Sequence, residues 1–251
     1  MLIRQNARRP NEMRELIITT DSVLGTDGAC QVSMGGTKAS CTVECHYHLK
    51  GIHIVYNESG RMKWQRQQGS VEHPSSSEAD VVEWVKKALL PSMVAATNQD
   101  AGWIIVLEAI SDDGSIESAC TIAATTALSI AVNHRSSRNS DMNGGAGVHL
   151  RHQVMSVTLG TFGGDIAVDL DKGEMQAAEM LAHFAVTSYG AIAKMNLDTR
   201  LQECRLAQLM TMAEIAIEHA KGCCSVINSA VNMAREFSGG GNNHRRSFRI
   251  G

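Results

Sequence analysis

Four potential metal ligands lie close together in the first fifth of the sequence: Cys41, Cys45, His46 and His48. A zinc site needs four nitrogen or sulfur ligands that converge on one point. Segment 38–48 alternates in the way of a half-buried β-strand, which places the two cysteines on one face and the two histidines on the other. Because the four side chains then diverge, we interpret them as core and surface residues and predict no metal there.

A run of carboxylates follows the middle of the chain. It comprises Asp165, Asp169, Asp171, Glu174 and Glu179. Carboxylates at the end of a strand could hold a divalent cation, because such cations prefer oxygen ligands. The same residues could equally form a solvated strand and turn. Composition leaves both interpretations open, and the first would make the chain a metal-dependent enzyme.

A basic loop with one aromatic residue is the third candidate: Arg61, Lys63, Trp64 and Arg66. Such a loop can neutralise phosphates and stack a base of single-stranded RNA, although a charged loop can also be merely solvated. The whole chain does not favour nucleic acid, because 23 basic and 26 acidic side chains leave a formal charge of −3. Any RNA contact must therefore be local.

Period-2 and period-3.6 patterns predict the elements that position these residues. Strands are expected at about 17–20, 30–34, 38–48, 51–56, 103–110, 154–162, 165–170, 181–186 and 191–197. Helices are expected at about 77–89, 117–132 and 202–235. This order predicts a single α+β domain in which a mixed β-sheet is packed with helices on one side.

The composition is that of a folded domain, with 43% hydrophobic and 20% charged residues in 251. We expect residues 1–237 to form the domain. A mobile loop is expected at 133–147, which is rich in Gly, Ser and Asn, and a basic, disordered tail at 238–251.

The start of the chain lacks the apolar region of a signal peptide, and no stretch reaches the roughly 18 apolar residues of a spanning helix. Seven scattered cysteines are typical of reduced thiols. We therefore expect a soluble protein of the cytoplasm, the nucleus or both.

Several stretches carry a family resemblance when they are taken in order. Residues 8–14 read RRPNEMR, and residues 26–38 read TDGACQVSMGGTK. Segment 107–131 contains SDDGS followed by an Ala-rich helix, and the C-terminal half contributes 165–179 and NLDTRL at 196–201. Together they resemble the RNase PH family, and in particular the RNase PH-like ring subunits of the eukaryotic RNA exosome. The resemblance spans about residues 5–235 and implies the RNase PH-like fold.

Active members of that family are phosphorolytic exoribonucleases, in which arginines hold the attacking phosphate and aspartates lie near a metal. The phosphate-holding arginine of the motif falls at Glu117 in this chain, and the two catalytic aspartates fall at Met175 and Leu181. A phosphate dianion needs cationic donors, so a carboxylate at the first position repels it. Methionine and leucine supply no hard oxygen ligand.

The resemblance therefore implies a non-catalytic ring subunit that scaffolds the channel for RNA processing and degradation, with no cofactor. The alternative is an active phosphate-dependent 3′–5′ exoribonuclease. The implied partners are other RNase PH-like ring subunits, RNA-binding cap subunits, an exosome-associated ribonuclease and RNA, without a membrane. Arg61, Lys63 and Arg66 would contact RNA, and the protein would be found in the nucleus, including the nucleolus, and in the cytoplasm.

Overall fold

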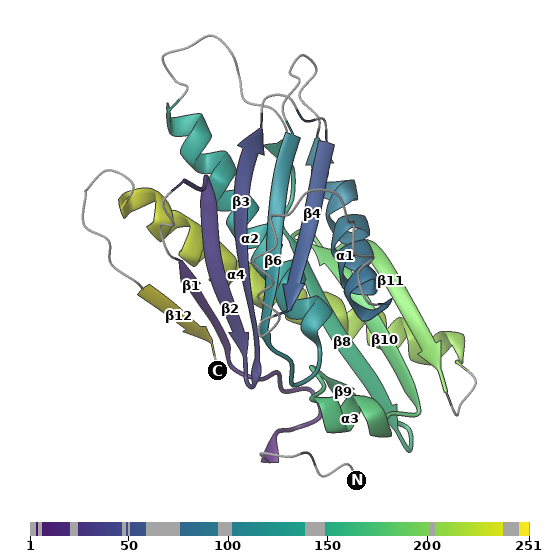
Figure 1. Cartoon of the computed structure of the whole chain (residues 1–251). Helices are drawn as coiled ribbons and strands as arrows, with labels where there is room; N and C mark the ends of the chain where they lie inside the picture. Colours follow the sequence, from purple (N-terminus) through teal and green to yellow (C-terminus); the bar gives the residue numbers. More distant parts are fainter. Residues whose placement is uncertain are drawn as a thin grey trace.

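The strands of the chain form two main sheets in the computed structural model (Figure 1). The structure describes residues 4, 7–20, 25–46, 49, 51–58, 76–94, 102–138, 149–200, 204–237 and 246–250. The larger sheet has the order β12-β1-β2-β3-β6-β4. Its strands are β1 (Leu16–Thr20), β2 (Gly28–Met34), β3 (Thr37–His46), β4 (Gly51–Glu58), β6 (Gly102–Ser111) and β12 (Arg246–Ile250). All neighbours are antiparallel except β4 and β6, so this sheet is mixed.

The smaller sheet is antiparallel throughout and has the order β11-β10-β8-β9. Its strands are β8 (Val154–Phe162), β9 (Asp165–Val168), β10 (Met180–Thr187) and β11 (Ile192–Thr199). A short pair, β5 (Met93–Val94) with β7 (His149–Leu150), completes the strands of the described residues.

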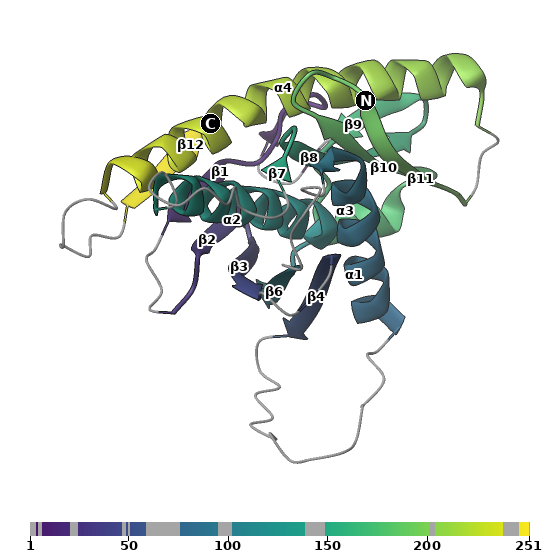
Figure 2. The same cartoon turned by 90° about the horizontal axis from the view of Figure 1, so that it is seen from above.

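The helices are α1 (Ser76–Leu89), α2 (Ile116–Arg138), α3 (Lys172–Ala177) and α4 (Leu206–Phe237), with a 3-10 turn η2 (Leu90–Ser92) after α1. Pro91 lies in that turn and ends α1, because proline cannot donate a backbone hydrogen bond. Helix α2 packs on β2 and β3 of the larger sheet and on β8 of the smaller one. Figure 2 shows α2 with β2, β3, β6 and β4 of the larger sheet on one side and α4 on the other.

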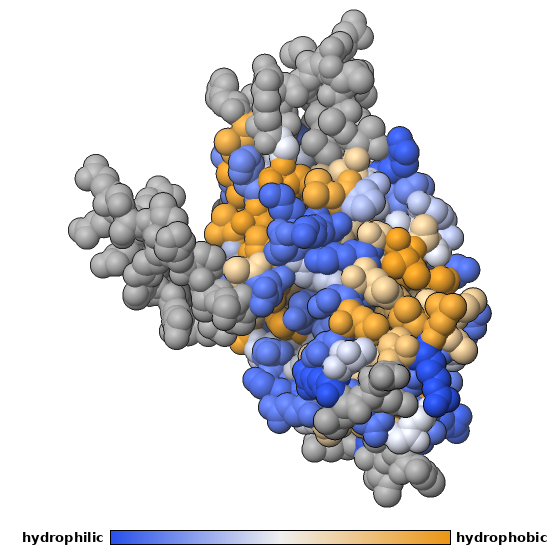
Figure 3. All heavy atoms as spheres, turned by 90° about the vertical axis from the view of Figure 1, so that its right-hand side faces the viewer, coloured by the Kyte–Doolittle hydropathy of each residue, from blue (hydrophilic) through white to orange (hydrophobic). Residues whose placement is uncertain are grey.

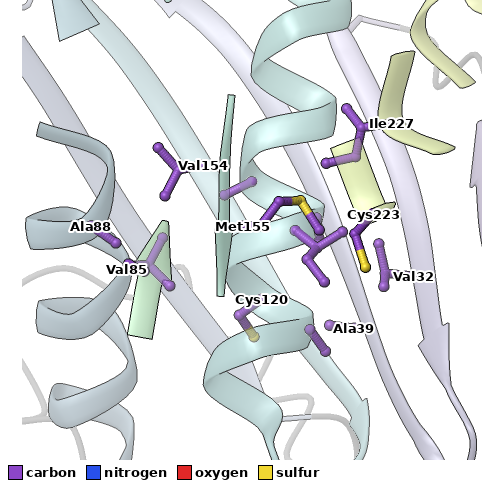
Figure 4. Close-up of a cluster of buried hydrophobic side chains, with 14 of the residues drawn as sticks. Val32, Ala39, Val85, Ala88, Cys120, Val154, Met155, Cys223 and Ile227 are labelled. Carbon is purple, nitrogen blue, oxygen red and sulfur yellow. The ribbon is translucent and has the colours of Figure 1, made fainter. Parts of the chain in front are cut away.

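Small side chains allow α2 to lie this deep in the molecule. Ala123, Ala127 and Ala131 are fully buried, and a Cβ added to Gly28 of β2 would lie only 2.2 Å from the Ala127 carbonyl oxygen. The core continues around α2 with side chains from both sheets, α1 and α4, among them Val32, Val85, Cys120, Met155 and Ile227 (Figure 4). By length and hydropathy, segment Ile116–Arg135 would also suit a membrane, but 78% of that window is buried inside the protein.

The α+β class with a mixed sheet is confirmed, and three expectations need correction. The strands after residue 154 form a second sheet, because α2 separates them from the first. Helix α2 continues through Arg138, into the segment predicted as a loop. The predicted disorder of the tail is wrong for Arg246–Ile250, because these residues pair with β1 along its whole length.

Candidate functional site

The site to which the sequence points lies at the N-terminal end of α2. Gly114 has a φ of +90° and Ser115 one of +60°, so the chain turns sharply before the helix begins at Ile116. A Cβ on Gly114 would lie 2.5 Å from the carbonyl carbon of Asp171, which brings the turn against the start of α3. Free N–H groups and the helix dipole make such an end attractive to anions.

Met175 of α3 covers this helix end. Its sulfur accepts a hydrogen bond from the Ser115 amide at 3.2 Å, and its carbonyl accepts one from Arg200 Nη1 at 2.8 Å. A capping box formed by Asp171 and Glu174 starts α3 and fixes the direction in which Met175 points. An amide of the helix end is thus bonded to a weak, uncharged acceptor.

Leu181 belongs to a small buried apolar group. It is 2% exposed and clusters with Ala167, Leu170 and Ala178, while Met175 and Phe162 pack against the same group. We call these six residues the apolar cluster. The two positions at which the resemblance implies metal-side carboxylates thus belong to one apolar cluster. A divalent cation does not fit them, because thioether and alkyl groups are not ligands for hard ions.

Glu117 occupies the first turn of α2 and is half-buried. Its charge affects the pKa of two neighbours, Cys120 and His183. Burial raises the pKa of Cys120, and Glu117 raises it further. Burial lowers the pKa of His183 on β10, while Glu117 opposes that shift. The carboxylate therefore brings negative charge to the helix end that the sequence resemblance assigns to phosphate binding.

His183 is a member of the site that the sequence did not indicate. Its Nδ1 lies 3.3 Å from Thr158 Oγ1, which in turn lies 3.2 Å from Ser118 Oγ of α2. Trp84 of α1 meets the imidazole edge-on, with ring centroids 5.9 Å apart. The only hint in the sequence is a polar residue in an apolar strand, and that pattern does not reveal which helix covers it.

The buried carboxylates of segment 165–179 stabilise the structure by pairing with arginines. Asp169 accepts from Arg14 at Nε (2.9 Å), at Nη2 (2.7 Å) and at the backbone amide (2.7 Å). Glu174 accepts from Nε and Nη2 of Arg4, both at 2.8 Å. Arg8 lies 3.3 Å from Glu174 and 3.7 Å from Asp169. We call these five residues the charge cluster.

The charge cluster pairs buried carboxylates with arginines. Burial alone would raise the pKa of Glu174, but the hydrogen bonds from Arg4 and from the Asp171 amide outweigh it and lower that pKa. Burial alone would lower the pKa of Arg14, but Asp169 outweighs it and raises that pKa. Arg14 also donates to the carbonyls of Asp113 and Gly114, so it ties the N-terminal segment to the turn before α2. These carboxylates are therefore engaged by arginines and by the cap of α3.

The other predicted groups are not assembled into a site by the described residues. Cys41 is buried and Cys45 half-buried on β3, with the buried Val43 between them, while His46 lies at the end of that strand. Among the residues that the structure describes, no group of three or more His, Cys, Asp or Glu could hold a metal ion. Arg61, Lys63, Trp64, Arg66 and His48 lie outside the described residues.

Comparisons with known proteins show what the chain is similar to. Residues 12–132 match the RNase PH family, described as the 3′ exoribonuclease family, domain 1. Exosome complex component Rrp41 of Pyrobaculum islandicum is 26% identical over 185 residues, which cover 70% of this chain and 69% of the relative. Rrp41 of Cenarchaeum symbiosum is 23% identical over 184 residues, 70% of each chain.

Solved structures share the fold at lower identity. Rice (Oryza sativa) Rrp46 superposes with a TM-score of 0.73 at 14% identity and covers 91% of this chain and 100% of its own. A chain of the Archaeoglobus fulgidus exosome with RNA bound to the active site gives a TM-score of 0.69 at 15% identity, with 88% and 91% covered. The RNase PH-like fold expected from the sequence motifs is confirmed.

Proposed function

We propose that the chain is a non-catalytic ring subunit of an RNA exosome, because residues 12–132 match the RNase PH family model. It scaffolds the central channel and contacts RNA during 3′–5′ processing and degradation. Its partners are other RNase PH-like ring subunits, RNA-binding cap subunits and an exosome-associated ribonuclease. Support for the assembly comes from relatives and structural neighbours that are themselves exosome components.

One observation carries the non-catalytic part of the proposal. None of the three positions that the motif assigns to phosphate and metal binding has the required chemistry. Glu117 adds negative charge, Met175 covers the Ser115 amide with its sulfur, and Leu181 is buried in the apolar cluster. Phosphorolysis needs cations at the phosphate and oxygen ligands at the metal, so this end of the helix lacks both requirements.

A phosphorolysis assay tests this part directly. The purified chain is incubated with 3′-labelled RNA, inorganic phosphate and Mg²⁺, and released nucleoside diphosphates are measured. We expect no phosphate-dependent release. Phosphate-dependent release of nucleoside diphosphates by the pure chain would instead identify the alternative, an active phosphate-dependent 3′–5′ exoribonuclease.

RNA contact is proposed for the basic loop of Arg61, Lys63 and Arg66. Cations in a loop suit phosphates, which need charge but little shape. Changing all three to Ala in the assembled complex should weaken RNA binding and flatten its salt dependence, because fewer counterions are released. A matched variant with Lys86 and Lys87 changed to Ala, on the exposed face of α1, should leave both unchanged. Equal effects in the two variants would contradict a specific role for the loop.

The proposed assembly places the protein in the nucleus, including the nucleolus, and in the cytoplasm. A mild affinity purification from the native cell, followed by mass spectrometry, tests partners and location together when nuclear and cytoplasmic fractions are processed separately. We expect homologous ring subunits in both fractions. Recovery of the chain without any RNase PH-like partner would contradict the proposal.

A further inference from the structure

A pair of sulfur atoms joins the long helix α4 to the N-terminal segment. The Sγ atom of Cys223 lies 4.0 Å from the Sδ atom of Met13. Cys223 is 7% exposed, and Figure 4 shows its side chain beside Val32 in the core. Met13 is half-buried, so the pair lies just below the surface. With metal–sulfur bonds of about 2.3 Å and an angle of about 120°, two sulfurs that bind one ion are about 4 Å apart. The observed spacing therefore fits a shared ion.

His219 lies four residues before Cys223 on α4, a spacing that places two side chains on one face of a helix. The imidazole is hydrogen-bonded to the backbone of Asn11, two residues before Met13. Burial raises the pKa of Cys223 to about 12 and lowers that of His219, and the charge of Asp169 raises both. The two side chains thus share a neighbour and face the N-terminal segment. One imidazole, one thiol and one thioether meet there.

The N-terminal segment holds Met13 in a fixed position. The Pro10 carbonyl accepts a hydrogen bond from the Val168 amide at 2.9 Å. On the other side of Met13, the Arg14 amide donates to the Asp169 carboxylate at 2.7 Å. A ligand that is already positioned loses little conformational freedom when an ion binds. The thioether is therefore preorganised toward the face of α4 that carries the other two side chains.

The types of donor atom select the ion. Thiolate and thioether sulfurs are soft ligands that favour Cu(I), and imidazole also binds copper. Zinc takes four ligands from cysteine, histidine and carboxylates, so only two of these three side chains suit it. A metal-binding histidine commonly donates its second ring N–H to a carbonyl or carboxylate, and the bond to the Asn11 backbone provides such a partner.

We propose that Met13, His219 and Cys223 form a binding site for one Cu(I) ion. On binding, the S–H bond of Cys223 breaks, the thiolate bonds to Cu(I), and the proton passes to solvent without any change of oxidation state. The Met13 sulfur and one imidazole nitrogen each donate a lone pair. The ion ties α4 to the N-terminal segment and stabilises the folded state. The site does not depend on the proposed exosome function.

Competition for Cu(I) provides the first test. Cu(I) is divided, without oxygen, between the full chain and the chelator bathocuproine disulfonate. The reference chain carries Cys45→Ser and Cys204→Ser, because these half-buried thiols would bind copper themselves. We expect one Cu(I) per chain, and Cys223→Ser should weaken its binding about a hundredfold. Cys224→Ser removes a buried thiol that points about 100° away on the helix, and it should leave binding unchanged. A reference chain that binds no Cu(I), or equal losses in the two variants, would overturn the proposal.

Variants of the other two ligands test the choice of ion. Met13→Leu keeps the side-chain volume, so the fold is retained, and it should weaken Cu(I) binding about tenfold. His219→Gln should weaken it by a similar factor. An equal concentration of Zn(II) should not displace Cu(I) from the reference chain. Full Cu(I) affinity in Met13→Leu, or displacement by Zn(II), would overturn the proposed ligand set.

Methionine methyl signals in NMR report on the thioether without any change of ligand. The chain contains 13 methionines, and isotope labelling of their methyl groups makes each signal visible. One equivalent of Cu(I) should shift the signal that is lost in Met13→Leu. Met195 of β11, which is 44% exposed, is the comparison and should not shift. Figure 3 faces the β11 side of the molecule and shows apolar side chains gathered on this surface. A shift of Met195 in place of Met13, or no shift, would overturn the proposal.

Discussion

The charge cluster and the apolar cluster are built from the same short segment, yet they have opposite chemistry. Asp169 and Glu174 are buried carboxylates held by Arg14 and Arg4. Met175 and Leu181 follow closely in the sequence and are buried without any charge. Both clusters lie against the turn before α2, because Arg14 donates to the Gly114 carbonyl and Met175 accepts from the Ser115 amide.

This contrast separates structural carboxylates from functional ones. A buried carboxylate is tolerated where an arginine neutralises it and satisfies its oxygens. The carboxylates that fix the N-terminal segment to the sheet meet this condition. At the positions where carboxylates would have to bind an ion, apolar side chains fill the space instead. The RNase PH-like fold can thus accommodate apolar residues at the two positions to which the resemblance assigns metal-side carboxylates.

The largest expected effect is loss of the central ion pair. Asp169 has a φ of +53°, which asparagine also tolerates, so Asp169→Asn changes the charge with little backbone strain. It leaves the buried Arg14 guanidinium without its counterion. We expect a loss of about 3–5 kcal/mol in the free energy of unfolding, measured by urea denaturation. Asp165→Asn, on an exposed position of β9, is the control and should change stability by less than about 0.5 kcal/mol.

A smaller loss in the free energy of unfolding is expected when the apolar cluster is changed. Leu181→Ala removes a buried side chain and leaves a cavity among Leu170 and Ala178, so unfolding should require about 2–3 kcal/mol less. Met175→Ala should cost less, because Met175 is only partly buried. If neither variant lowered the free energy of unfolding, the apolar cluster would not stabilise the fold. The two clusters would then differ in their side-chain chemistry but would not both contribute to stability.

Periodicity predicted nearly every long element of this fold. Strands with clear alternation, such as β3, and helices with small or apolar stripes, such as α2 and α4, lie close to the predicted ranges. Short α3 was missed because a six-residue helix has too few turns to show a period. Its start is marked by the capping box of Asp171 and Glu174. The strand β12 was missed because its pairing with β1 is a long-range contact, and the Gly-rich basic tail around it has the composition of a disordered segment.

Only those residues of the site that belong to a recognisable sequence motif could be predicted from the sequence. The family resemblance pointed to Glu117, Met175 and Leu181, and the structure places Met175 against the apolar cluster that contains Leu181. Arg14 belongs to a quoted motif, but its partner Asp169 is 155 residues away. No local pattern links two such residues, nor does one place His183 beside Thr158. Pairings of this kind follow from the packing of the two sheets around α2.

A pH-dependent effect should come from His183. Burial is the main cause that lowers the pKa of His183, and the positive charges of Arg200 and Lys194 lower it further. The negative charges of Glu117 and Asp198 raise it but do not outweigh these effects. Below about pH 6.5 the unfolded chain therefore gains a proton that the folded chain does not, and stability falls as the pH decreases. His183→Asn keeps a partner for Thr158 but cannot titrate, so its stability should fall less between pH 7 and pH 5. Because the pKa of His219 is also lowered, some slope remains; an unchanged slope would contradict the assignment.

The smallest effect we predict is a gain of phosphate binding at the start of α2. Glu117→Arg replaces repulsion by a cation beside free helix amides, a combination that binds anions. If the site then binds with a Kd on the order of 10 mM, 50 mM phosphate stabilises the fold by about 1 kcal/mol, a rise in Tm of roughly 2–4 °C. The wild type and Glu117→Gln, compared in chloride of equal ionic strength, should show less. Equal stabilisation of the wild type would mean that Glu117 does not repel anions from this helix end, and the basis for a non-catalytic subunit would be lost.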